Sequence, residues 1–420
     1  MRVLLINDYA TPTGGAEIVT FAIRDALRRR GHDARLFASS AGREGSTKLA
    51  DYECLGTTGC FRTVLQSANP WAFWRLRRAL KEFRPDVVHI TLFLTQLSPL
   101  ILPLLRRIPT VYYAVWYRAI CPLGTKRLPD GGTCTSPAGG ACLRHRCLPW
   151  RDWLPLMLQM RLWRRWRGSV DRIVANSEVV RALLTDEGLE VPSVIHHGAQ
   201  PLPPRPTLSA PPMVVFAGRL VREKGVEVLV RAFARVASIV PEAWLFIAGK
   251  GPERERLERL SADLGVSGRV CMAGHLSRSD LEAALAGAWV QAVPSLWPEP
   301  FGLAAAEGMM RGTAVVASDT GGLREFIRDG QTGLLVSPGD VEALAVAIIG
   351  LIFDPERAER IGAAGRAHAL AHLGLDSMVD QFVRLYEELL RDRPHASAIR
   401  GPLTVARRLF GGSSSNRGGT

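Results

Sequence analysis

The chain contains no apolar segment long enough to cross a membrane, and we expect no secretory leader. Its most apolar window begins at Ile90 and is interrupted by Gln96, Ser98, Pro99 and Pro103, so it is a poor candidate for a spanning helix. The N-terminus, MRVLLINDYA, lacks a cationic region followed by a long apolar run and is typical of a buried strand. We therefore expect a cytoplasmic protein without transmembrane helices.

Cysteine pairs of the CxxC type are also missing. The chain has seven cysteines, and in a reducing cytosol such residues are more often free or metal-bound than joined in disulfides. One glycine-rich insertion, residues 121–147, holds four of them near His145: Cys121, Cys134, Cys142 and Cys147. A structural zinc ion bound by these four is one interpretation, and free thiols in a buried loop are the other, which the spacing slightly favours.

Acidic residues are outnumbered by basic ones. The 420-residue chain has 53 Lys and Arg against 40 Asp and Glu, a net charge of +13. This balance indicates an anionic partner, such as nucleic acid, acidic lipid headgroups or phosphorylated substrates. No nucleic-acid recognition motif accompanies the charge, so we expect no nucleic-acid partner. Because five of the basic residues are lysines, a lysine in this chain is more informative than an arginine.

Short apolar runs alternate with amphipathic segments along most of the sequence. Runs such as RVLLI, ARLFA, DVVHI and PTVYYAV do so in the first half, and MVVFAGRL, WLFIAG, RVCMAG and TAVVAS in the second. This βαβ order is typical of parallel sheets covered by helices on both faces. The predicted fold class is therefore α/β, with two doubly wound Rossmann-like domains facing each other across a central cleft.

A proline-rich stretch predicts where the two domains meet in the chain. Residues 1–197 are expected to form the first domain and residues 213–375 the second, joined by the proline-rich linker 198–212. Residues 376–391 have the pattern of an amphipathic helix, which we expect to pack back on the first domain. Residues 392–420 are rich in Gly and Ser and predict a flexible tail.

Ligands of doubly wound sheets bind beyond the carboxyl ends of the strands, where several loops carry glycine and basic residues. Gly14 and Gly15 precede a helix after the first strand, in a loop that either approaches an anion closely or simply makes a tight turn. Arg219 and Lys224 share one loop of the second domain, and two cations there suit a diphosphate. Lys250 lies in the next such loop and is a weaker candidate.

Two glutamates eight positions apart are the most informative feature of the second half. In SLWPEPFGLAAAEGMM, a helix beginning at Phe301 would place Glu299 just before its N-terminus and Glu307 two turns inside it. A helix start binds anions through its free N–H groups, and carboxylates hold hydroxyl groups. The combination suggests a nucleotide sugar, although a plain turn before a helix is the more usual explanation of an isolated pair.

Several motifs of the chain, taken as a set, resemble those of a known family. GGAE, GRLVREKG, EPFGLAAAE and SDTGGLREFI followed by GLLVSPGD are similar to motifs of the retaining GT-B glycosyltransferases of family 4, which carry an E-x7-E signature. The resemblance extends to about residue 390. It implies transfer of a hexosyl unit from a UDP- or GDP-sugar to a saccharide or lipid-linked acceptor, with retention at the anomeric carbon and without a catalytic cofactor.

The resemblance also implies roles for single residues. Glu299 would be the catalytic residue, beside the reacting carbon of the transferred sugar. Seven others would bind the donor: Arg219 and Lys224 at the diphosphate, Gly15 facing it from the first domain, Glu307 at the ribose, and Phe301, Gly302 and Leu303 through backbone amides.

The sequence departs from the family pattern at one position. Members often carry a His before the CP pair, where this chain has Val115 in VWYRAICP. That His is expected to contact the donor sugar, so its replacement motivates an alternative: a catalytically degenerate binding or scaffold subunit. His89 is a candidate substitute, although a strand-end His is more often structural. A nucleotide-sugar epimerase on the same fold is a further alternative.

Residues 149–172 combine tryptophan with arginine. On a helix, Leu158, Leu162 and Trp166 share one face, and Arg161, Arg164 and Arg165 share another. This composition is typical of a membrane-surface helix, and equally of a core-packing helix with a solvated basic face. The first interpretation predicts peripheral association with an anionic membrane surface, at the inner face of the cell membrane.

Overall fold

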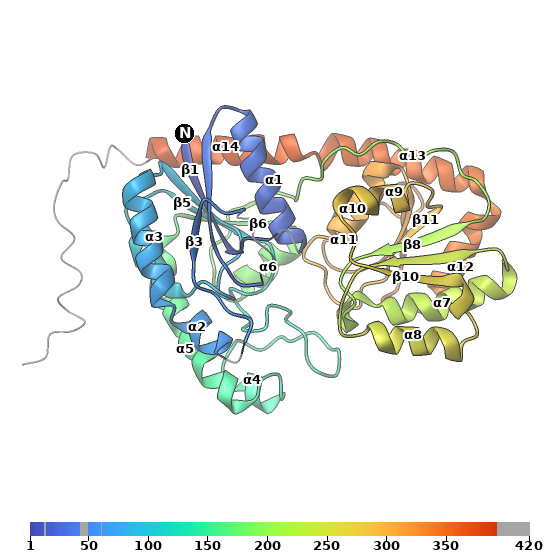
Figure 1. Ribbon diagram of the computed structural model, residues 1–420, viewed down its shortest axis with the longest axis horizontal. Helices are drawn as coiled ribbons and strands as arrows, with labels where there is room; N and C mark the ends of the chain where they lie inside the picture. The colour runs from blue at the N-terminus through green and yellow to red at the C-terminus, as the bar shows by residue number, and fades with distance from the viewer. Residues whose placement is uncertain (12–13, 43–48, 60, 393–420) are drawn as a thin grey trace, which may run out of the picture.

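The computed structural model describes residues 1–11, 14–42, 49–59 and 61–392, and it shows two α/β domains side by side (Figure 1). The tail expected at 392–420 lies outside the described residues apart from Asp392, which ends the last helix. No helix in the described part of the chain is long and apolar enough to cross a membrane.

The first domain is built on a seven-stranded parallel sheet in the order β3-β2-β1-β4-β5-β6-β7. Its strands are β1 (Arg2–Tyr9), β2 (Asp33–Ser39), β3 (Tyr52–Cys54), β4 (Val87–Ile90), β5 (Thr110–Ala114), β6 (Arg172–Ala175) and β7 (Ser193–Val194). Every residue of β5 is buried, as expected for a strand covered on both faces. The short edge strand β3 was not predicted.

Helices cover both faces of this sheet. They are α1 (Gly15–Arg29), α2 (Arg62–Ser67), α3 (Pro70–Phe83), α4 (Ala141–Arg144), α5 (Trp150–Trp166), α6 (Glu178–Asp186) and, from the end of the chain, α14 (Leu375–Asp392). Side chains cap several of them: Asn69 accepts a hydrogen bond from the N–H of Ala72 at the start of α3, and Ser177 does the same for Val180 in α6. Such caps satisfy N–H groups that have no partner within the helix.

The second domain repeats the plan on a six-stranded parallel sheet in the order β10-β9-β8-β11-β12-β13. Its strands are β8 (Met213–Ala217), β9 (Trp244–Ala248), β10 (Val270–Gly274), β11 (Val290–Val293), β12 (Ala314–Ser318) and β13 (Leu334–Val336). Its helices are α7 (Val226–Ile239), α8 (Arg254–Asp263), α9 (Arg278–Leu285), α10 (Leu303–Arg311), α11 (Leu323–Phe326), α12 (Val341–Phe353) and α13 (Pro355–His372).

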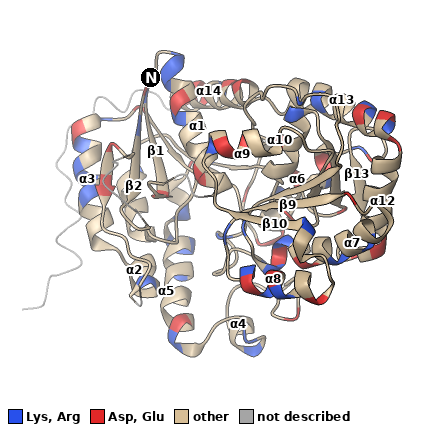
Figure 2. Cartoon of the chain, turned by 45° about the vertical axis from the view of Figure 1, so that its right-hand side comes forward, with Lys and Arg blue, Asp and Glu red and all other residues tan. Residues whose placement is uncertain are grey.

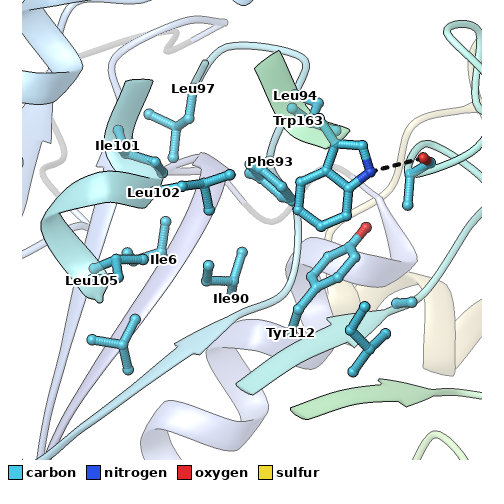
Figure 3. Close-up of a cluster of buried hydrophobic side chains, with 14 of the residues drawn as sticks. Ile6, Ile90, Phe93, Leu94, Leu97, Ile101, Leu102, Leu105, Tyr112 and Trp163 are labelled. Atoms are coloured by element: carbon cyan, nitrogen blue, oxygen red, sulfur yellow. Dashed lines mark hydrogen bonds between the residues drawn. The ribbon is translucent and has the colours of Figure 1, made fainter. Parts of the chain in front are cut away.

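One face of the first sheet packs on α3, α5 and the 3₁₀ segment Pro99–Leu105. Figure 3 shows Trp163 of α5 pointing into this core beside Phe93 and Tyr112, with its indole N–H donating to the carbonyl of Ala119 at 3.0 Å. The three rings meet edge to face, with centroids 5.2 to 5.8 Å apart, a favoured aromatic geometry. The buried side of α5 is therefore the one that carries Trp163.

The opposite face of the first sheet packs on α1 and α14. Val379, Phe382 and Tyr386 of α14 are fully buried in the same cluster as Leu5 and Ile23. The chain therefore passes between the domains twice, and the two passages touch: the N–H of Ala199 donates to the carbonyl of Leu373, and the N–H of Leu375 donates to that of Ala199. The beginning of the proline-rich segment is thus hydrogen-bonded to the segment that leads from α13 into α14.

Candidate active site

A lysine and a glutamate from different loops form the centre of the site. Lys224 ends the short turn Arg222–Lys224 after β8, and Glu299 lies in the loop between β11 and α10. The ammonium group of Lys224 donates to Oε1 of Glu299 at 2.6 Å. Glu299 is buried, with 3% of its surface exposed, so the ion pair is largely removed from water.

Glycine backbones bring these two loops together. Gly225 has φ 65°, and a Cβ at this position would lie 1.9 Å from the carbonyl oxygen of Pro294. Gly321, with φ 56°, lets the segment before α11 approach Glu299, since a Cβ there would lie 2.3 Å from the carbonyl oxygen of Glu299. Only glycine tolerates such contacts and positive φ values at no steric cost. Both glycines therefore position the Lys224–Glu299 pair.

The Glu299 carboxylate has further partners on its own loop. Ser295, which is also buried, donates its hydroxyl to Oε1 of Glu299 at 2.5 Å. The ring of Trp297 lies 5.9 Å from the Lys224 ammonium group, within the range of a cation–π contact. Burial opposes ionisation of the carboxyl group, but the charge of Lys224 and the hydrogen bonds outweigh it and lower the pKa of Glu299. Glu299 is therefore ionised at neutral pH.

Glu307 lies closer to the helix start than its spacing predicted. Helix α10 begins at Leu303 and not at Phe301, which puts Glu307 one turn inside the helix instead of two. Its carboxylate accepts a hydrogen bond from Nη1 of Arg278 at 2.5 Å. Burial lowers the pKa of the Arg278 guanidinium group, but the charge of Glu307 and its hydrogen bond outweigh burial, so the net effect is a raised pKa. Sequence analysis missed Arg278, whose position at the start of α9 gave no signal.

The residues expected to offer backbone amides surround the start of α10. Gly302 precedes the helix with φ 104°, and Phe301 is buried, with its ring 4.9 Å from that of Phe326 and 5.3 Å from that of His197. Gly15 at the start of α1 faces Leu303, since a Cβ on Gly15 would lie 3.5 Å from Cδ2 of Leu303. The two helix starts, one from each domain, therefore face each other, and each offers free N–H groups to an anion.

Two further basic residues remain exposed beside the pair. The Arg219 side chain is 62% exposed and has one acidic neighbour among the described residues, Glu223 at 3.9 Å. Lys250 is exposed, and within the described part of the chain it has no ion-pair partner. Arg219 acts electrostatically across the domain boundary on Glu17 of α1. Both cations are thus accessible to an anionic ligand.

Glu17 was missed by the sequence analysis although it belongs to the GGAE motif. It is buried at the first turn of α1, and its carboxylate folds back toward Gly14, where an added Cβ would lie 2.5 Å from Oε2. Burial is the main cause that raises the pKa of Glu17, to about 7, and the nearby Asp8 adds to it. A group that titrates near neutral pH therefore adjoins the glycine loop.

Tyr117 joins the first domain to the Glu299 loop. Its hydroxyl donates to the carbonyl of Pro298 at 2.9 Å, and its ring lies 6.1 Å from that of Trp297. Burial, followed by the charges of Glu299 and Glu325, raises the pKa of Tyr117, so the phenol stays protonated as a donor. Sequence analysis named the run VWYRAICP without singling out this residue.

Neither histidine position considered in the sequence analysis supplies a ring at the pair. Val115 is buried among the apolar residues of the first domain. His89 is fully buried, with Nδ1 2.6 Å from the hydroxyl of Tyr386 and its ring against Phe382 of α14. His89 is therefore a structural residue between β4 and α14, and it does not substitute for the missing His. Burial lowers its pKa to about 3.

The insertion 121–147 reaches the second domain. Together with residues 221–228 and Leu296 it lines a cavity of about 370 Å³ next to the Lys224 turn. Its four cysteines are near enough to act on one another: burial raises the pKa of Cys142, with Cys121 and Cys134 adding to it, and burial with the other three cysteines raises the pKa of Cys147. The thiol of Cys134 lies 3.7 Å from the carbonyl of Ser136, and that of Cys147 lies 4.0 Å from the carbonyl of His145. No group of three or more His, Cys, Asp or Glu among the described residues could hold a metal ion, which disagrees with the zinc site considered for Cys121, Cys134, Cys142 and Cys147.

The protein has two Rossmann-like domains with the Lys224–Glu299 pair and two helix starts between them, which is the architecture of the GT-B class. Two family models match the chain: "Glycosyltransferase Family 4" over residues 13–201 and "Glycosyl transferases group 1" over residues 204–368. The two matches follow one another along the chain, and the gap between them, residues 202–203, lies in the linker. The chain belongs to this family of glycosyltransferases, which confirms the resemblance seen in its motifs.

Curated relatives match parts of the chain. A GDP-mannose-dependent alpha-(1-6)-phosphatidylinositol monomannoside mannosyltransferase from Mycolicibacterium smegmatis is 39% identical over 165 residues, 38% of this chain and 43% of the relative. The lipopolysaccharide core biosynthesis glycosyltransferase LpsE from Rhizobium meliloti is 35% identical over 41% of this chain and 49% of the relative. A glycogen synthase from Mycobacterium tuberculosis is 32% identical over 50% and 51%. The chain thus spans about half the length of these relatives.

Solved structures share the fold over nearly the whole chain. Sucrose-phosphate synthase from Thermosynechococcus elongatus superposes with a TM-score of 0.72 at 22% identity, covering 94% of this chain and 100% of that one. HepE from Anabaena, solved in complex with UDP-glucose, gives a TM-score of 0.67 at 19% identity, covering 92% and 100%. The predicted fold, two doubly wound domains of the GT-B type, is confirmed.

Proposed function

We propose that the protein is a retaining glycosyltransferase that moves a hexosyl unit from a UDP- or GDP-sugar to a saccharide or lipid-linked acceptor in glycan biosynthesis. The observation that carries this proposal is the ion pair between Lys224 and the buried carboxylate of Glu299, beside the start of α10. Lys224 is a cation suited to bind a leaving phosphate, and Glu299 is a carboxylate suited to contact the sugar. The two groups are hydrogen-bonded to each other.

The charges of the site fit the chemistry of transfer. As the bond between sugar and nucleoside diphosphate breaks, the leaving group gains negative charge. The proposal assigns the stabilisation of that charge to Lys224, Arg219 and the N–H groups at the starts of α1 and α10. Interactions that strengthen in the transition state accelerate the reaction. Glu299, ionised beside Lys224, is suited to stabilise positive charge on the sugar ring. We propose that the transfer requires no catalytic cofactor.

The relatives support the substrate classes without choosing among them. One is named for GDP-mannose and a phosphatidylinositol mannoside, another for the core of lipopolysaccharide, and a third for glycogen. The structure of HepE contains UDP-glucose. A UDP- or GDP-sugar donor and a saccharide or lipid-linked acceptor are therefore the classes to test. With a lipid-linked acceptor, the enzyme would work at the cytoplasmic face of a membrane.

A donor assay tests the proposal without a known acceptor. The protein is titrated with UDP and GDP by calorimetry and then screened for slow hydrolysis of a panel of nucleotide sugars. We expect one nucleotide to bind and one donor to be hydrolysed. Binding of neither nucleotide would overturn the proposal in favour of a scaffold subunit, the alternative that Val115 suggests.

Two variants test the roles within the pair. Removing one preorganised charged group from a transition-state site typically costs about 10² to 10³ in rate. We expect Glu299→Ala to lose hydrolysis on this scale while binding the nucleotide normally, and Lys224→Ala to lose both hydrolysis and nucleotide affinity. Lys81→Ala, an exposed lysine on α3, is the matched control. Activity near that of the wild type in either site variant would contradict the assignment.

A further inference from the structure

Exposed apolar side chains gather on one edge of the first domain. Seven of the sixteen large exposed hydrophobic residues of the described chain lie on, or directly before, the three helices α2, α3 and α5, and their exposed fractions run from 48% to 77%: Phe61, Val64, Trp71, Trp74, Trp150, Leu154 and Leu158. Patches of this kind on a soluble domain mark an interaction site. We call these seven residues the apolar patch.

The three helices form one connected surface. The hydroxyl of Thr63 in α2 donates to Asp152 in α5 at 3.0 Å, and Ser67 at the end of α2 donates to the carbonyl of Pro155 at 2.6 Å. Helix α3 begins three residues after α2 ends. Figure 1 shows α2, α3 and α5 together at the side of the first domain that is remote from the second domain. The patch therefore lies away from the contact between the domains.

The exposed stripe of α5 continues from apolar to basic residues. Trp150, Leu154 and Leu158 recur at four-residue intervals and are followed on the same side by Arg161 and Arg165, all of them exposed. The sequence analysis predicted these arginines on a face separate from Leu158, Leu162 and Trp166. The structure differs because α5 buries Leu156, Met160 and Trp163 against the core, which leaves Leu158 at the surface.

Basic charge on these helices is not compensated by acidic neighbours. Together α2, α3 and α5 carry nine Arg and Lys but two acidic residues, Glu82 and Asp152. Arg78, Lys81, Arg161 and Arg165 are exposed and have no ion-pair partner within the described part of the chain. Helix α8 differs, because Arg254 and Arg256 pair there with glutamates, and Figure 2 shows red and blue side by side along it.

We propose that the apolar patch and its flanking basic residues dock the protein on a lipid bilayer that carries anionic headgroups. Tryptophan rings prefer the boundary between headgroups and acyl chains, and arginine side chains extend from there to lipid phosphates. Acidic lipids attract such basic clusters at the surface of a bilayer. The chain's net charge of +13 acts in the same direction. A protein partner would not require the uncompensated arginines that continue the apolar stripe.

The docking surface is bonded to the part of the first domain that faces the candidate active site. The indole N–H of Trp153 in α5 donates to the carbonyl of Gly139 at 2.9 Å, and Gly139 lies in the insertion that lines the cavity beside Leu296. A bilayer bound to α5 would therefore contact a helix that is hydrogen-bonded to the insertion lining that cavity. The docking surface does not depend on the proposed transfer reaction.

Flotation of the full-length protein with vesicles tests the proposal. The vesicles are made of phosphatidylcholine alone or with roughly 30 mol% phosphatidylglycerol, a strongly anionic surface, and contain neither donor nor acceptor. We expect the protein to float with the anionic vesicles, at least tenfold less with the neutral ones, and less as salt rises. Absence of binding to the anionic vesicles would overturn the proposal, whatever the outcome of the nucleotide assay.

Variants locate the binding surface. Trp150→Ser/Leu154→Ser and Arg161→Glu/Arg165→Glu should each reduce flotation at least tenfold while binding the same nucleotide as the wild type in calorimetry, which shows that they fold. Phe353→Ser is the matched control, because Phe353 is 66% exposed but lies on α12 of the second domain. Unchanged flotation of both double variants would overturn the proposal. So would a wild-type dimer that the Trp150→Ser/Leu154→Ser variant dissociates, since the patch would then join two copies of the chain.

Discussion

Glu299 depends on Lys224 for its charge, because the Lys224 ammonium group and the hydrogen bonds of the site outweigh the effect of burial on the Glu299 carboxyl group. Glu299 is buried whereas Lys224 is partly exposed, so removing Lys224 leaves the Glu299 carboxylate buried without compensation. The lowered pKa of Glu299 means that its ionisation stabilises the fold above the pKa of the unfolded chain. This stabilisation is lost as the pH falls through the lower pKa of the folded state.

A double-mutant cycle measures this dependence in stability. We expect Lys224→Met to lower the thermal midpoint more than Lys224→Met/Glu299→Gln does, with a coupling free energy of about 0.5–3 kcal/mol, the usual range for directly bonded groups. Calorimetric or fluorescence melting at pH 7 gives the values. Additive effects of the two substitutions would show that the pair is not coupled. Lys81→Met serves as the control for loss of a lysine from the surface.

The sequence indicated the members of the pair but not their partners. Lys224 stood out because lysine is rare in this chain, and Glu299 because of its spacing to Glu307. Ser295 gave no signal although it lies four positions before Glu299 on the same loop. Tyr117 and Arg278 gave none because their contacts join distant segments: Tyr117 and Pro298 are 181 positions apart. Short motifs carry residue identities, whereas hydrogen bonds between distant segments are set by tertiary packing.

At the scale of the element, the start of α10 shows the limit of pattern reading. The run from Phe301 has helical composition, but Gly302 has φ 104°, which is outside the helical range. Phe301 is instead held in a buried aromatic contact with Phe326. A tertiary contact and a left-handed glycine therefore shift the helix start by two residues. The predicted strands were read more reliably, because burial on both faces produces continuous apolar runs.

Helix α14 and strand β4 share a buried histidine that makes their packing pH-dependent. Burial lowers the pKa of His89 to about 3, so the folded state binds the proton more weakly than the unfolded chain, whose His pKa is near 6.5. Stability is then complete above about pH 6.5 and falls as the pH falls toward 3. His197, also buried with a pKa near 3, contributes with the same sign.

A substitution isolates the contribution of His89. Between pH 7 and pH 5 a single such histidine costs about 2 kcal/mol of unfolding free energy. We expect His89→Leu to be less stable than the wild type at pH 7, because the bond to Tyr386 is lost, but to lose fewer degrees in thermal midpoint on going to pH 5. His145→Leu, at an exposed position, should change neither value. An equal pH dependence in His89→Leu and wild type would contradict the assignment.

At the scale of the whole molecule, one carboxylate connects the two domains. Glu325 of α11 accepts hydrogen bonds from the N–H groups of Glu178 and Val179, at 2.9 and 3.0 Å, and lies 3.0 Å from Nε2 of His196. It thereby caps α6, a helix of the other domain. Burial opposes its ionisation, but the bond to His196 and the two backbone bonds outweigh it and lower the pKa of Glu325.

Removing this carboxylate should loosen the contact between the domains. We expect Glu325→Ala to leave each domain folded but to increase the radius of gyration measured by small-angle X-ray scattering. In the wild type the contact should weaken as the pH falls through the lowered pKa of Glu325, since protonation removes the charge that accepts the two bonds. Glu388→Ala, at an exposed position of α14, is the control. Identical scattering of Glu325→Ala and wild type would contradict this role.

The number and order of the domains could be read from the sequence, because alternating strands and helices and a proline-rich segment are local features. The contact through Glu325 could not, because its residues are 147 and 129 positions apart. The position of α14 was predictable from its amphipathic pattern, which requires an apolar surface to cover. The sequence could not show which residues α14 would pack against, such as His89, because these residues come together only when the sheet folds.

The two touching passages between the domains, at Ala199 and at Leu373 to Leu375, make the first domain discontinuous in the chain. During translation, residues 1–197 emerge from the ribosome before α14, yet one face of their sheet is covered only in part, by α1, until α14 is made. The second domain, by contrast, is continuous and can complete its core while still attached. The apolar surface that later receives Val379, Phe382 and Tyr386 is thus exposed throughout synthesis of the second domain, which makes the first part of the nascent chain a candidate substrate for chaperones.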